Sequence, residues 1–234
     1  MNRPETTLFL LVSADGKISL GDNDNLDVDK QLKEIPGIAE GLHQYYELEQ
    51  QTDQVSLNTG RVMAKIGVNE RTETPVKIPV DFIIIDSKPH LTEAGVRYLS
   101  QWVQTLYLPT TNPNHPCFSL SDELDNIVPL LLPDPTDFSA LFERFASEFG
   151  MTRITLQSGG TLNATLLREG IIDHVSLVIA PYLVGGKDTS SLIDGESLHS
   201  PAEIHKIRPL HLVECRQMED SYLYLRYDVV NEVK

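Results

Sequence analysis

The sequence predicts an α/β fold with a mainly parallel sheet, helices on both faces and an antiparallel hairpin at the C-terminus. Apolar runs of about four to eight residues alternate with segments of helical period over most of the 234 residues. Several of these runs are apolar throughout, which is typical of parallel strands covered on both sides. The chain ends in two alternating runs about a polar turn, the pattern of a hairpin.

The first half of the chain predicts four strands and two helices. A buried strand over residues 8–12 is followed by the acidic stretch "SLGDNDNLDVDK". We expect a solvated loop there, because the glycine and final glutamate of a calcium-binding loop are missing. Apolar spacing predicts a helix over 38–49, then a strand in "TDQVSLNTGRV" that ends at Gly60. Two further strands, "VDFIIIDS" and "TLYLPTT", flank the helical segment "HLTEAGVRYLSQWV".

The second half continues the alternation of strands and helices. Three prolines and two asparagines predict a loop over 109–116, after which "NIVPLLLP" is a candidate strand. A helix over 137–150 ends at a glycine, and the buried strand "TRITLQ" follows it. After a helix that starts near Thr161, the run "HVSLVIAPYLVGG" predicts a strand broken by Pro181. Residues 211–230 form the predicted C-terminal hairpin.

Composition predicts one soluble, cytoplasmic domain over residues 1–234. The hydrophobic content of 41% suffices for a continuous core, and the early apolar run is too short for a signal peptide or a membrane span. A net charge of −15 argues against nucleic-acid binding, because phosphate contacts need clustered lysine and arginine. The two cysteines and seven histidines have no metal-ligand spacing, so we expect no metal site.

Two adjacent glycines in "LQSGGTLNATLLREG" mark a strand-to-helix junction. In open α/β sheets, ligands bind beyond the carboxyl ends of the strands. Gly159 and Gly160 would let the backbone approach a ligand closely, and the helix that follows would direct its N–H groups and positive dipole end toward it. The junction therefore predicts an anion site suited to a pyrophosphate, although the Rossmann fingerprint and the P-loop lysine are absent.

Four segments together resemble the reductase domain of riboflavin biosynthesis. They are "SADGKI", "TDQVSLNTGRV", "DFIIIDS" and "QSGGTLNATLLREGIIDHVSLVIAPYLVGG", in the family's order, and the resemblance spans about residues 7–230. It implies a three-layer α/β/α, dihydrofolate-reductase-like fold. The family occurs as the C-terminal domain of a bifunctional deaminase–reductase and as stand-alone proteins, and this chain lacks the His/Cys zinc signature of the deaminase.

The resemblance implies NADPH as the cofactor and assigns residues to it. The segment at the glycine junction matches the family's pyrophosphate cradle, a first-half turn faces the cofactor phosphates, and the end of "FIIIDS" touches the adenosine half. In this sequence the matching residues are Gly159, Gly160, Thr161, Leu162 and Asn163; Thr59, Gly60 and Arg61; and Ser87.

The implied reaction is hydride transfer to C1 of 5-amino-6-(5-phosphoribosylamino)uracil, giving the ribitylamino compound. Asp15 and Lys17 match the family's "DGK" turn beside nicotinamide and substrate and are the candidate catalytic residues. A bound water is an equal candidate for the proton donor. Gln157 stands where the family has a substrate-facing glutamate, and either Arg71 or Lys77 would have to replace the family's arginine for the substrate phosphate.

The sequence leaves two alternative functions open, and the resemblance also implies a quaternary state. A reductase of the same fold could act on another pterin-like, pyrimidine or small carbonyl or imine substrate. A nucleotide-binding module without catalysis would keep the glycine turn and Arg61 but transfer no hydride. Members of the family are commonly dimers joined through the sheet and its C-terminal strands, so we expect a homodimer.

Overall fold

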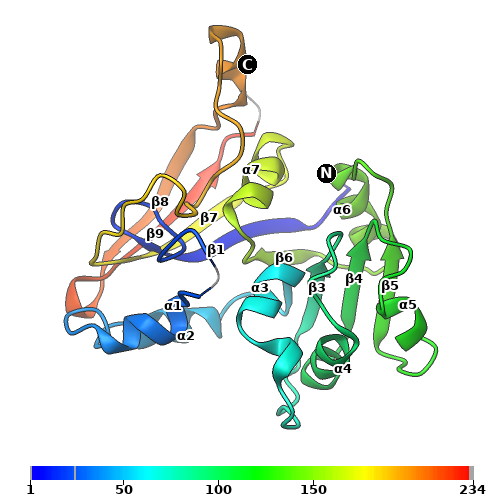
Figure 1. The fold of residues 1–234 in the computed structure, drawn as a ribbon. Helices are drawn as coiled ribbons and strands as arrows, with labels where there is room; N and C mark the ends of the chain where they lie inside the picture. Colours follow the sequence, from blue (N-terminus) through cyan, green and yellow to red (C-terminus); the bar gives the residue numbers. More distant parts are fainter. Residues whose placement is uncertain (1, 24, 232–234) are drawn as a thin grey trace. The chain divides into compact units, whose positions relative to one another are not determined.

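The computed structural model describes residues 2–23 and 25–231, which form two compact units. Unit one combines the N-terminal residues up to Pro4 with Asp53–Ser158. Unit two combines Glu5–Thr52 with the segment from Gly159 onward. Figure 1 shows the elements of both units, coloured along the chain.

Unit one is built on five parallel strands in the order β5-β4-β3-β2-β6. In the register of the sheet, Thr59 lies beside Ile85, and Leu57 lies beside Leu156. The carboxyl ends of these strands therefore meet at one edge. The strands are β2 (Val55–Thr59), β3 (Asp81–Ile85), β4 (Leu106–Thr110), β5 (Ile127–Leu131) and β6 (Arg153–Leu156).

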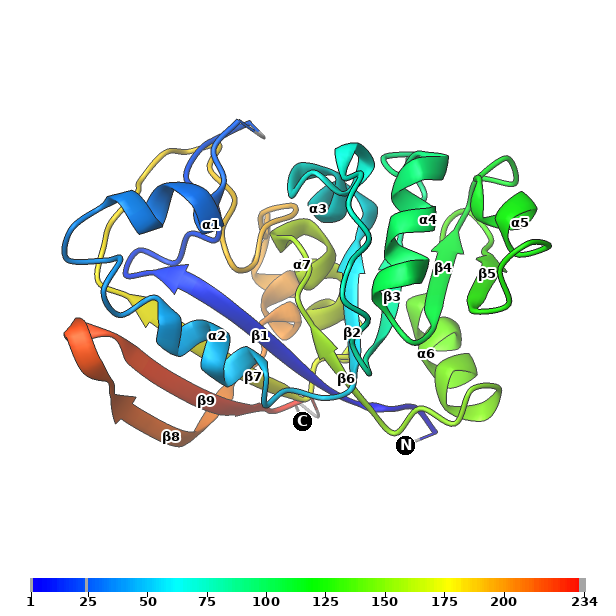
Figure 2. The same ribbon diagram turned by 90° about the horizontal axis from the view of Figure 1, so that it is seen from below.

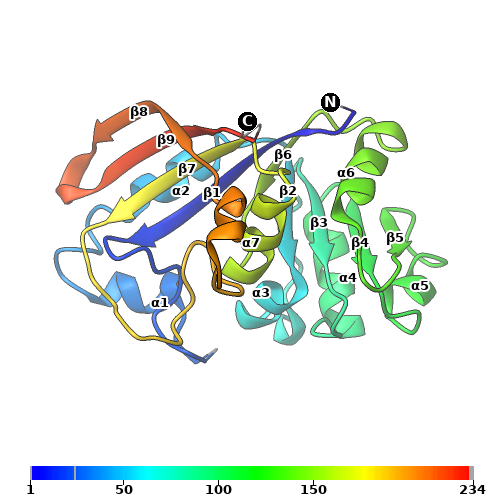
Figure 3. The same ribbon diagram turned by 90° about the horizontal axis from the view of Figure 1, so that it is seen from above.

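Helices cover both faces of the sheet in unit one, as the opposite views in Figures 2 and 3 show. Leu106 and Leu108 of β4 pack in one core cluster with residues of the helices α3, α4 and α5. Tyr107, which alternates with them, stacks edge-to-face on Phe149, just after helix α6, with ring centroids 5.0 Å apart. The elements are α3 (Gly60–Lys65), the 3-10 turn η2 (Val68–Glu70), α4 (Glu93–Trp102), α5 (Cys117–Leu120) and α6 (Phe138–Ser147).

Unit two holds four strands in the order β1-β7-β9-β8. The first pair is parallel, and the pairs of β7 with β9 and of β9 with β8 are antiparallel. The last two strands form the C-terminal hairpin about the 3-10 turn η4 (Glu219–Ser221). The strands are β1 (Glu5–Ser13), β7 (His174–Ala180), β8 (Leu210–Gln217) and β9 (Leu223–Val229).

The helices of unit two also lie on both faces of its strands. Phe9 of β1 stacks on Tyr45 of α2 with ring centroids 5.2 Å apart, within a core that includes Val178 and Tyr222. Helix α7 covers the other face, in front of β1 in Figure 3, where α2 lies behind. The elements are α1 (Val28–Gln31), η1 (Leu32–Glu34), α2 (His43–Glu49), α7 (Gly160–Arg168) and η3 (Pro201–Lys206).

The predicted fold class is confirmed: parallel strands with helices on both faces precede an antiparallel C-terminal hairpin. Three local predictions were wrong. The acidic loop contains helix α1, because the Asp27 side chain accepts a hydrogen bond from the Asp29 N–H and caps it. The helix expected over 38–49 begins at His43. The loop expected over 109–116 begins only after Thr110, because Pro109 and Thr110 belong to β4. The single-domain assignment stays a prediction.

Candidate functional site

In unit one, the predicted cofactor turn lies at the junction of β2 and α3. The Thr59 hydroxyl caps α3 by accepting a hydrogen bond from the Val62 N–H at 3.4 Å. Gly60 is buried, and a Cβ on it would overlap the Asp86 carboxylate. Gly60 is therefore required for packing of the β2–α3 junction against the end of β3.

Asp86, the first residue after β3, is the centre of a buried network. Its carboxylate contacts Nε2 of the fully buried His115 at 3.1 Å and Nδ1 of His90 at 3.0 Å, and it accepts the Leu91 N–H at 2.9 Å. Burial by itself raises the pKa of Asp86, but these hydrogen bonds outweigh burial and hold the pKa below its usual value. The Cys117 N–H donates to His115 Nδ1 at 3.2 Å, which leaves Nε2 to carry the proton that faces Asp86.

The parallel register brings the other predicted residues of unit one to the same sheet edge. Arg61 is exposed in the first turn of α3, and Ser87 follows Asp86 directly. The Ser87 hydroxyl accepts a hydrogen bond from the Thr111 N–H at 3.3 Å. Gln157 follows β6, and its Oε1 accepts a hydrogen bond from the Ser56 hydroxyl at 2.8 Å. This contact fixes the side-chain amide of the predicted substrate residue.

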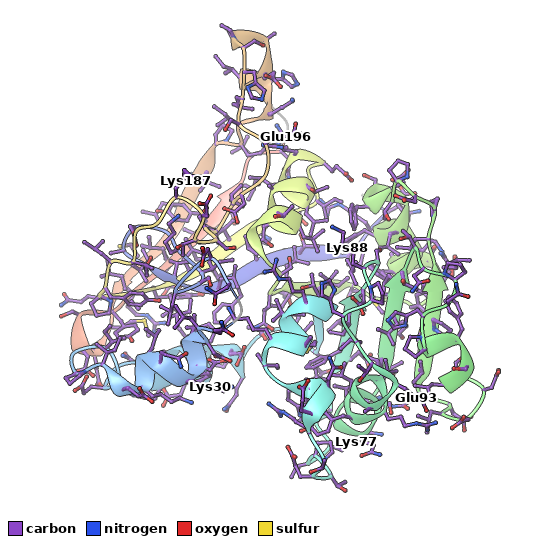
Figure 4. All side chains as sticks on the ribbon, in the orientation of Figure 1. Lys30, Lys77, Lys88, Glu93, Lys187 and Glu196 are labelled. Atoms are coloured by element: carbon purple, nitrogen blue, oxygen red, sulfur yellow. The ribbon has the colours of Figure 1, made fainter. Side chains whose placement is uncertain are left out.

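Arg71, a candidate for the substrate phosphate, is held by an aromatic pair. Its guanidinium donates to the Tyr98 hydroxyl at 3.1 Å and lies 5.4 Å from the Tyr98 ring centroid and 5.8 Å from that of Trp102. A second N–H group donates to the Ile66 carbonyl at 3.3 Å. These contacts give Arg71 a packing role. Lys77, the other candidate, is exposed and is labelled in Figure 4.

In unit two, the turn after β1 presents Asp15 and Lys17. The Asp15 carboxylate accepts hydrogen bonds from the Ser13 hydroxyl at 2.5 Å and from the Gly185 N–H at 2.7 Å. These bonds lower its pKa to about 2, so Asp15 is an anion at neutral pH and a poor proton donor. The Lys17 ammonium donates to the Thr189 carbonyl at 2.8 Å. Of the two predicted catalytic side chains, Lys17 is the one that donates a hydrogen bond.

The two glycines at the start of α7 have different roles. Gly159 is the N-cap, with φ −75° and ψ 159°, and nothing lies within 4 Å of a Cβ placed on it. Gly160 is buried, and a Cβ there would collide with the Ser191 carbonyl and the Asp194 carboxylate. Gly160 therefore serves packing, whereas neither backbone strain nor protein packing accounts for the glycine at 159.

The remaining predicted cofactor residues lie in the first turn of α7. Thr161 is exposed and Leu162 is partly exposed, whereas Asn163 is fully buried. The Asn163 amide donates to the Leu192 carbonyl at 2.9 Å. Its side chain thus binds the protein's own backbone, and its main-chain N–H donates to the Gly159 carbonyl at 3.1 Å. Direct cofactor contact by Asn163 stays a prediction.

Sequence reasoning missed His115 and the segment that follows β7. His115 stood in a proline-rich stretch interpreted as a loop, and nothing local indicates that it contacts Asp86, which lies 29 residues away along the chain. Ser191 and Asp194 follow a Gly-Gly pair in a stretch without periodicity. The one signal was the pair of glycines at 60 and 160, each of which proves to lie against a carboxylate of its own unit.

The described part of the chain, which omits residues 1, 24 and 232–234, holds neither a metal-ligand cluster nor a membrane-spanning helix. Among those residues there is no cluster of three or more His, Cys, Asp or Glu side chains that could hold a metal ion. No helix in the same ranges is long and apolar enough to cross a membrane.

Comparison with known proteins identifies relatives over almost the whole chain. The family model of the RibD C-terminal domain matches residues 4–224. A 2,5-diamino-6-ribosylamino-4(3H)-pyrimidinone 5′-phosphate reductase of Methanothermobacter thermautotrophicus is 28% identical over 205 residues, covering 86% of this chain and 88% of the relative. A protein of the same name from Aquifex aeolicus is 22% identical over 244 residues and is covered, like this chain, to 100%.

Solved structures show the same fold. RibD of Acinetobacter baumannii superposes with a TM-score of 0.69 at 14% identity, covering 98% of this chain and 59% of the longer RibD chain. A riboflavin biosynthesis reductase of Saccharomyces cerevisiae gives a TM-score of 0.61 at 16% identity, with 98% of this chain and 91% of that chain covered. The resemblance read from the sequence is confirmed, and this chain belongs to the family of the RibD C-terminal domain.

Proposed function

We propose that this protein is an NADPH-dependent reductase that converts the ribosylamino group of a pyrimidine 5′-phosphate into a ribitylamino group. One observation carries the proposal for this member of the reductase family: Gly159 leaves open space at the N-terminus of α7, which has no side-chain cap. When bound, NADPH supplies the hydride for the reduction.

The first turn of α7 fits the anionic part of the cofactor. The helix spans nine residues, and its N-terminal N–H groups and positive dipole end favour a negatively charged group. Because residue 159 has no Cβ, the backbone can approach such a group closely. In unit one, the proposal assigns Thr59, Gly60, Arg61 and Ser87 to cofactor binding, which their grouping at the carboxyl ends of β2 and β3 supports.

Side chains of this protein provide the polar groups of the reaction. Lys17 is a charged donor whose ammonium is oriented by the Thr189 carbonyl, and we assign it to substrate binding and proton supply. Asp15 keeps the main chain at Val184 and Gly185 in place through their N–H groups. Gln157, oriented by Ser56, offers a neutral amide to the substrate.

The names of the relatives favour one of two pyrimidine substrates. The two relatives described above are named for the 2,5-diamino-pyrimidinone, whereas the resemblance read from the sequence implied the uracil. The two compounds share the ribosylamino phosphate that is reduced and differ at C2, which carries an amino group in one and an oxygen in the other. We propose the diamino compound as the substrate of this chain.

Loss of NADPH absorbance tests this function. The purified protein is incubated with NADPH or NADH and with each pyrimidine in turn. Turnover with the diamino compound and NADPH is the expected result. Turnover confined to the uracil would overturn the substrate assignment, and NADPH binding without turnover of either compound would leave a reductase of another small substrate or a nucleotide-binding module. Absence of NADPH binding would overturn the reductase proposal.

We further propose that the protein is a homodimer joined through its C-terminal hairpin. Strand β8 is the last strand in the order of its unit, and it exposes the apolar side chains of Leu210, Leu212 and Val213. An exposed apolar edge strand pairs readily with a second chain. The cytoplasmic location stays a prediction.

Replacing Leu212 by glutamate is expected to convert the dimer to a monomer. The substitution places a charge on the apolar edge, where two copies would bring like charges together. Light scattering coupled to gel filtration measures the mass. Leu131→Glu is the matched control, since Leu131 is 53% exposed on β5 and Leu212 is 49% exposed on β8. A dimer that survives Leu212→Glu but dissociates with Leu131→Glu would place the interface on β5 and overturn its assignment to β8.

A further inference from the structure

One segment of unit two contacts both the Lys17 turn and the first turn of α7. This segment, Val184 to Asp194, contains no helix or strand, and we call it the strap. Figure 3 shows it as the gold chain that leaves the end of β7. Lys187, labelled in Figure 4, lies on the strap with a side chain that is 88% exposed.

The beginning of the strap is bound by the ionised Asp15. The carboxylate accepts the Val184 N–H at 3.2 Å and the Gly185 N–H at 2.7 Å. Hydrogen bonds to an ionised acceptor are stronger than neutral ones. The strap is therefore anchored at the turn that carries Lys17.

The middle of the strap runs beside the residues around Lys17. The Ile18 N–H donates to the Ser190 carbonyl at 3.0 Å, and the Leu192 N–H donates to the Gly16 carbonyl at 3.0 Å. Between them, the Lys17 ammonium donates to the Thr189 carbonyl at 2.8 Å. A lysine side chain has a flexible four-carbon stem, so a hydrogen bond to its ammonium is needed to keep it in one orientation. The Thr189 carbonyl supplies that hold.

The end of the strap is bound to α7. The Asp194 N–H donates to the Gly160 carbonyl at 3.0 Å, and the Asn163 amide donates to the Leu192 carbonyl at 2.9 Å. The Asp194 carboxylate also closes the turn on itself, because it accepts the Ser191 N–H at 3.0 Å and the Ser191 hydroxyl at 2.5 Å. This closed turn lies against Gly160, where no side chain would fit.

We propose that the strap sets the position of the Lys17 ammonium relative to the first turn of α7, and that Asp194 is a positioning residue that acts on Lys17 through it. Asp194 and Lys17 need not touch, because the backbone from Thr189 to Asp194 joins their contacts. The consequence for catalysis rests on the proposed function, in which α7 binds the cofactor and Lys17 serves the substrate. The mechanical link, by which Asp194 sets the position of Lys17 through the strap, does not depend on that function.

Amide hydrogen exchange, resolved by NMR, tests the mechanical link without any activity. In Asp194→Ala, exchange of the Ile18 and Leu192 amides is expected to rise at least about tenfold, because the turn that holds the strap is open. The Leu10 amide in β1 serves as the internal reference. Asp188→Ala is the matched control, since Asp188 lies on the same strap and pairs with Lys187 at its exposed surface. Unchanged exchange at Ile18 and Leu192 would overturn the proposal.

A double-mutant cycle tests the consequence for catalysis. Asp194→Ala is expected to lower kcat about tenfold in the wild-type background and less than about twofold in a Lys17→Ala background, because the two side chains act on one step. Equal losses in both backgrounds would show a merely structural role and overturn the proposal.

Asp194→Asn keeps an acceptor oxygen for the Ser191 N–H and is expected to restore part of the loss. Exchange that responds as expected in a protein without turnover would count against the proposed function and leave the strap's mechanical role in place.

Discussion

Replacing Asp86 by alanine is expected to lower the free energy of unfolding by about 2 to 5 kcal/mol, because it leaves buried hydrogen-bond donors without an acceptor at about 1 to 3 kcal/mol each. The carboxylate is completely buried and contacts His115, His90 and the Leu91 N–H. Without it, the His115 Nε2–H and the Leu91 N–H lose their acceptor inside the protein, and unpaired buried donors are costly. Urea unfolding at neutral pH measures the change.

The control for Asp86→Ala is Asp122→Ala, because Asp122 is an exposed carboxylate of the same unit. Substitutions at such surface positions change stability by about 0.5 kcal/mol or less. An Asp86→Ala variant that unfolds at the same urea concentration as the control would show that the network contributes nothing to the fold.

The contribution of Asp86 is also expected to depend on pH. Its pKa in the folded protein lies below the ordinary value of 3.8, so its ionised form stabilises the fold above that value. This stabilisation is lost as the pH falls through the folded pKa. The difference in unfolding free energy between wild type and Asp86→Asn should therefore shrink as the pH falls below 3.8. A difference that grows as the pH falls would contradict this assignment.

Replacing Gly159 by aspartate is expected to weaken NADPH binding about 10- to 100-fold while leaving the protein folded. The backbone angles at Gly159 suit any residue, and nothing obstructs a side chain. Aspartate is a preferred N-cap, so the thermal stability should stay level or rise. The same carboxylate would stand where the anionic part of the cofactor binds, and the like charges repel. Fluorescence titration and thermal unfolding on the same preparations measure both effects.

Gly159→Asn is the matched control for this substitution. Asparagine caps a helix about as well as aspartate and has nearly the same volume, but it carries no charge. Binding that falls with aspartate and much less with asparagine would identify electrostatic repulsion of an anion as the cause. Equal NADPH affinity in wild type and Gly159→Asp would remove the first turn of α7 from the cofactor site. Position 160 cannot serve in this experiment, because a side chain there would displace the Ser191–Asp194 turn.

Local pattern in the sequence determined most of the elements. The run "VDFIIIDS" is apolar enough to specify the buried strand β3, and Asp137 with Gly150 marks both ends of α6. The alternating runs at 211–230 became the β8–β9 hairpin. These features depend on residues that are neighbours along the chain, so periodicity and capping reveal them. The same holds for the glycine junctions at 60 and 160, which mark where strands give way to helices.

Tertiary structure decided what those glycines do and which side chains act together. Gly159 and Gly160 are equivalent in sequence, yet one faces open space and the other a turn some thirty residues further along the chain. The Asp86–His115 contact spans 29 residues and the Lys17–Thr189 contact spans 172. Such pairs depend on the order in which strands assemble and on the path of the loops between them. No local period records that order, so the sequence located the junctions while the fold alone assigned their partners.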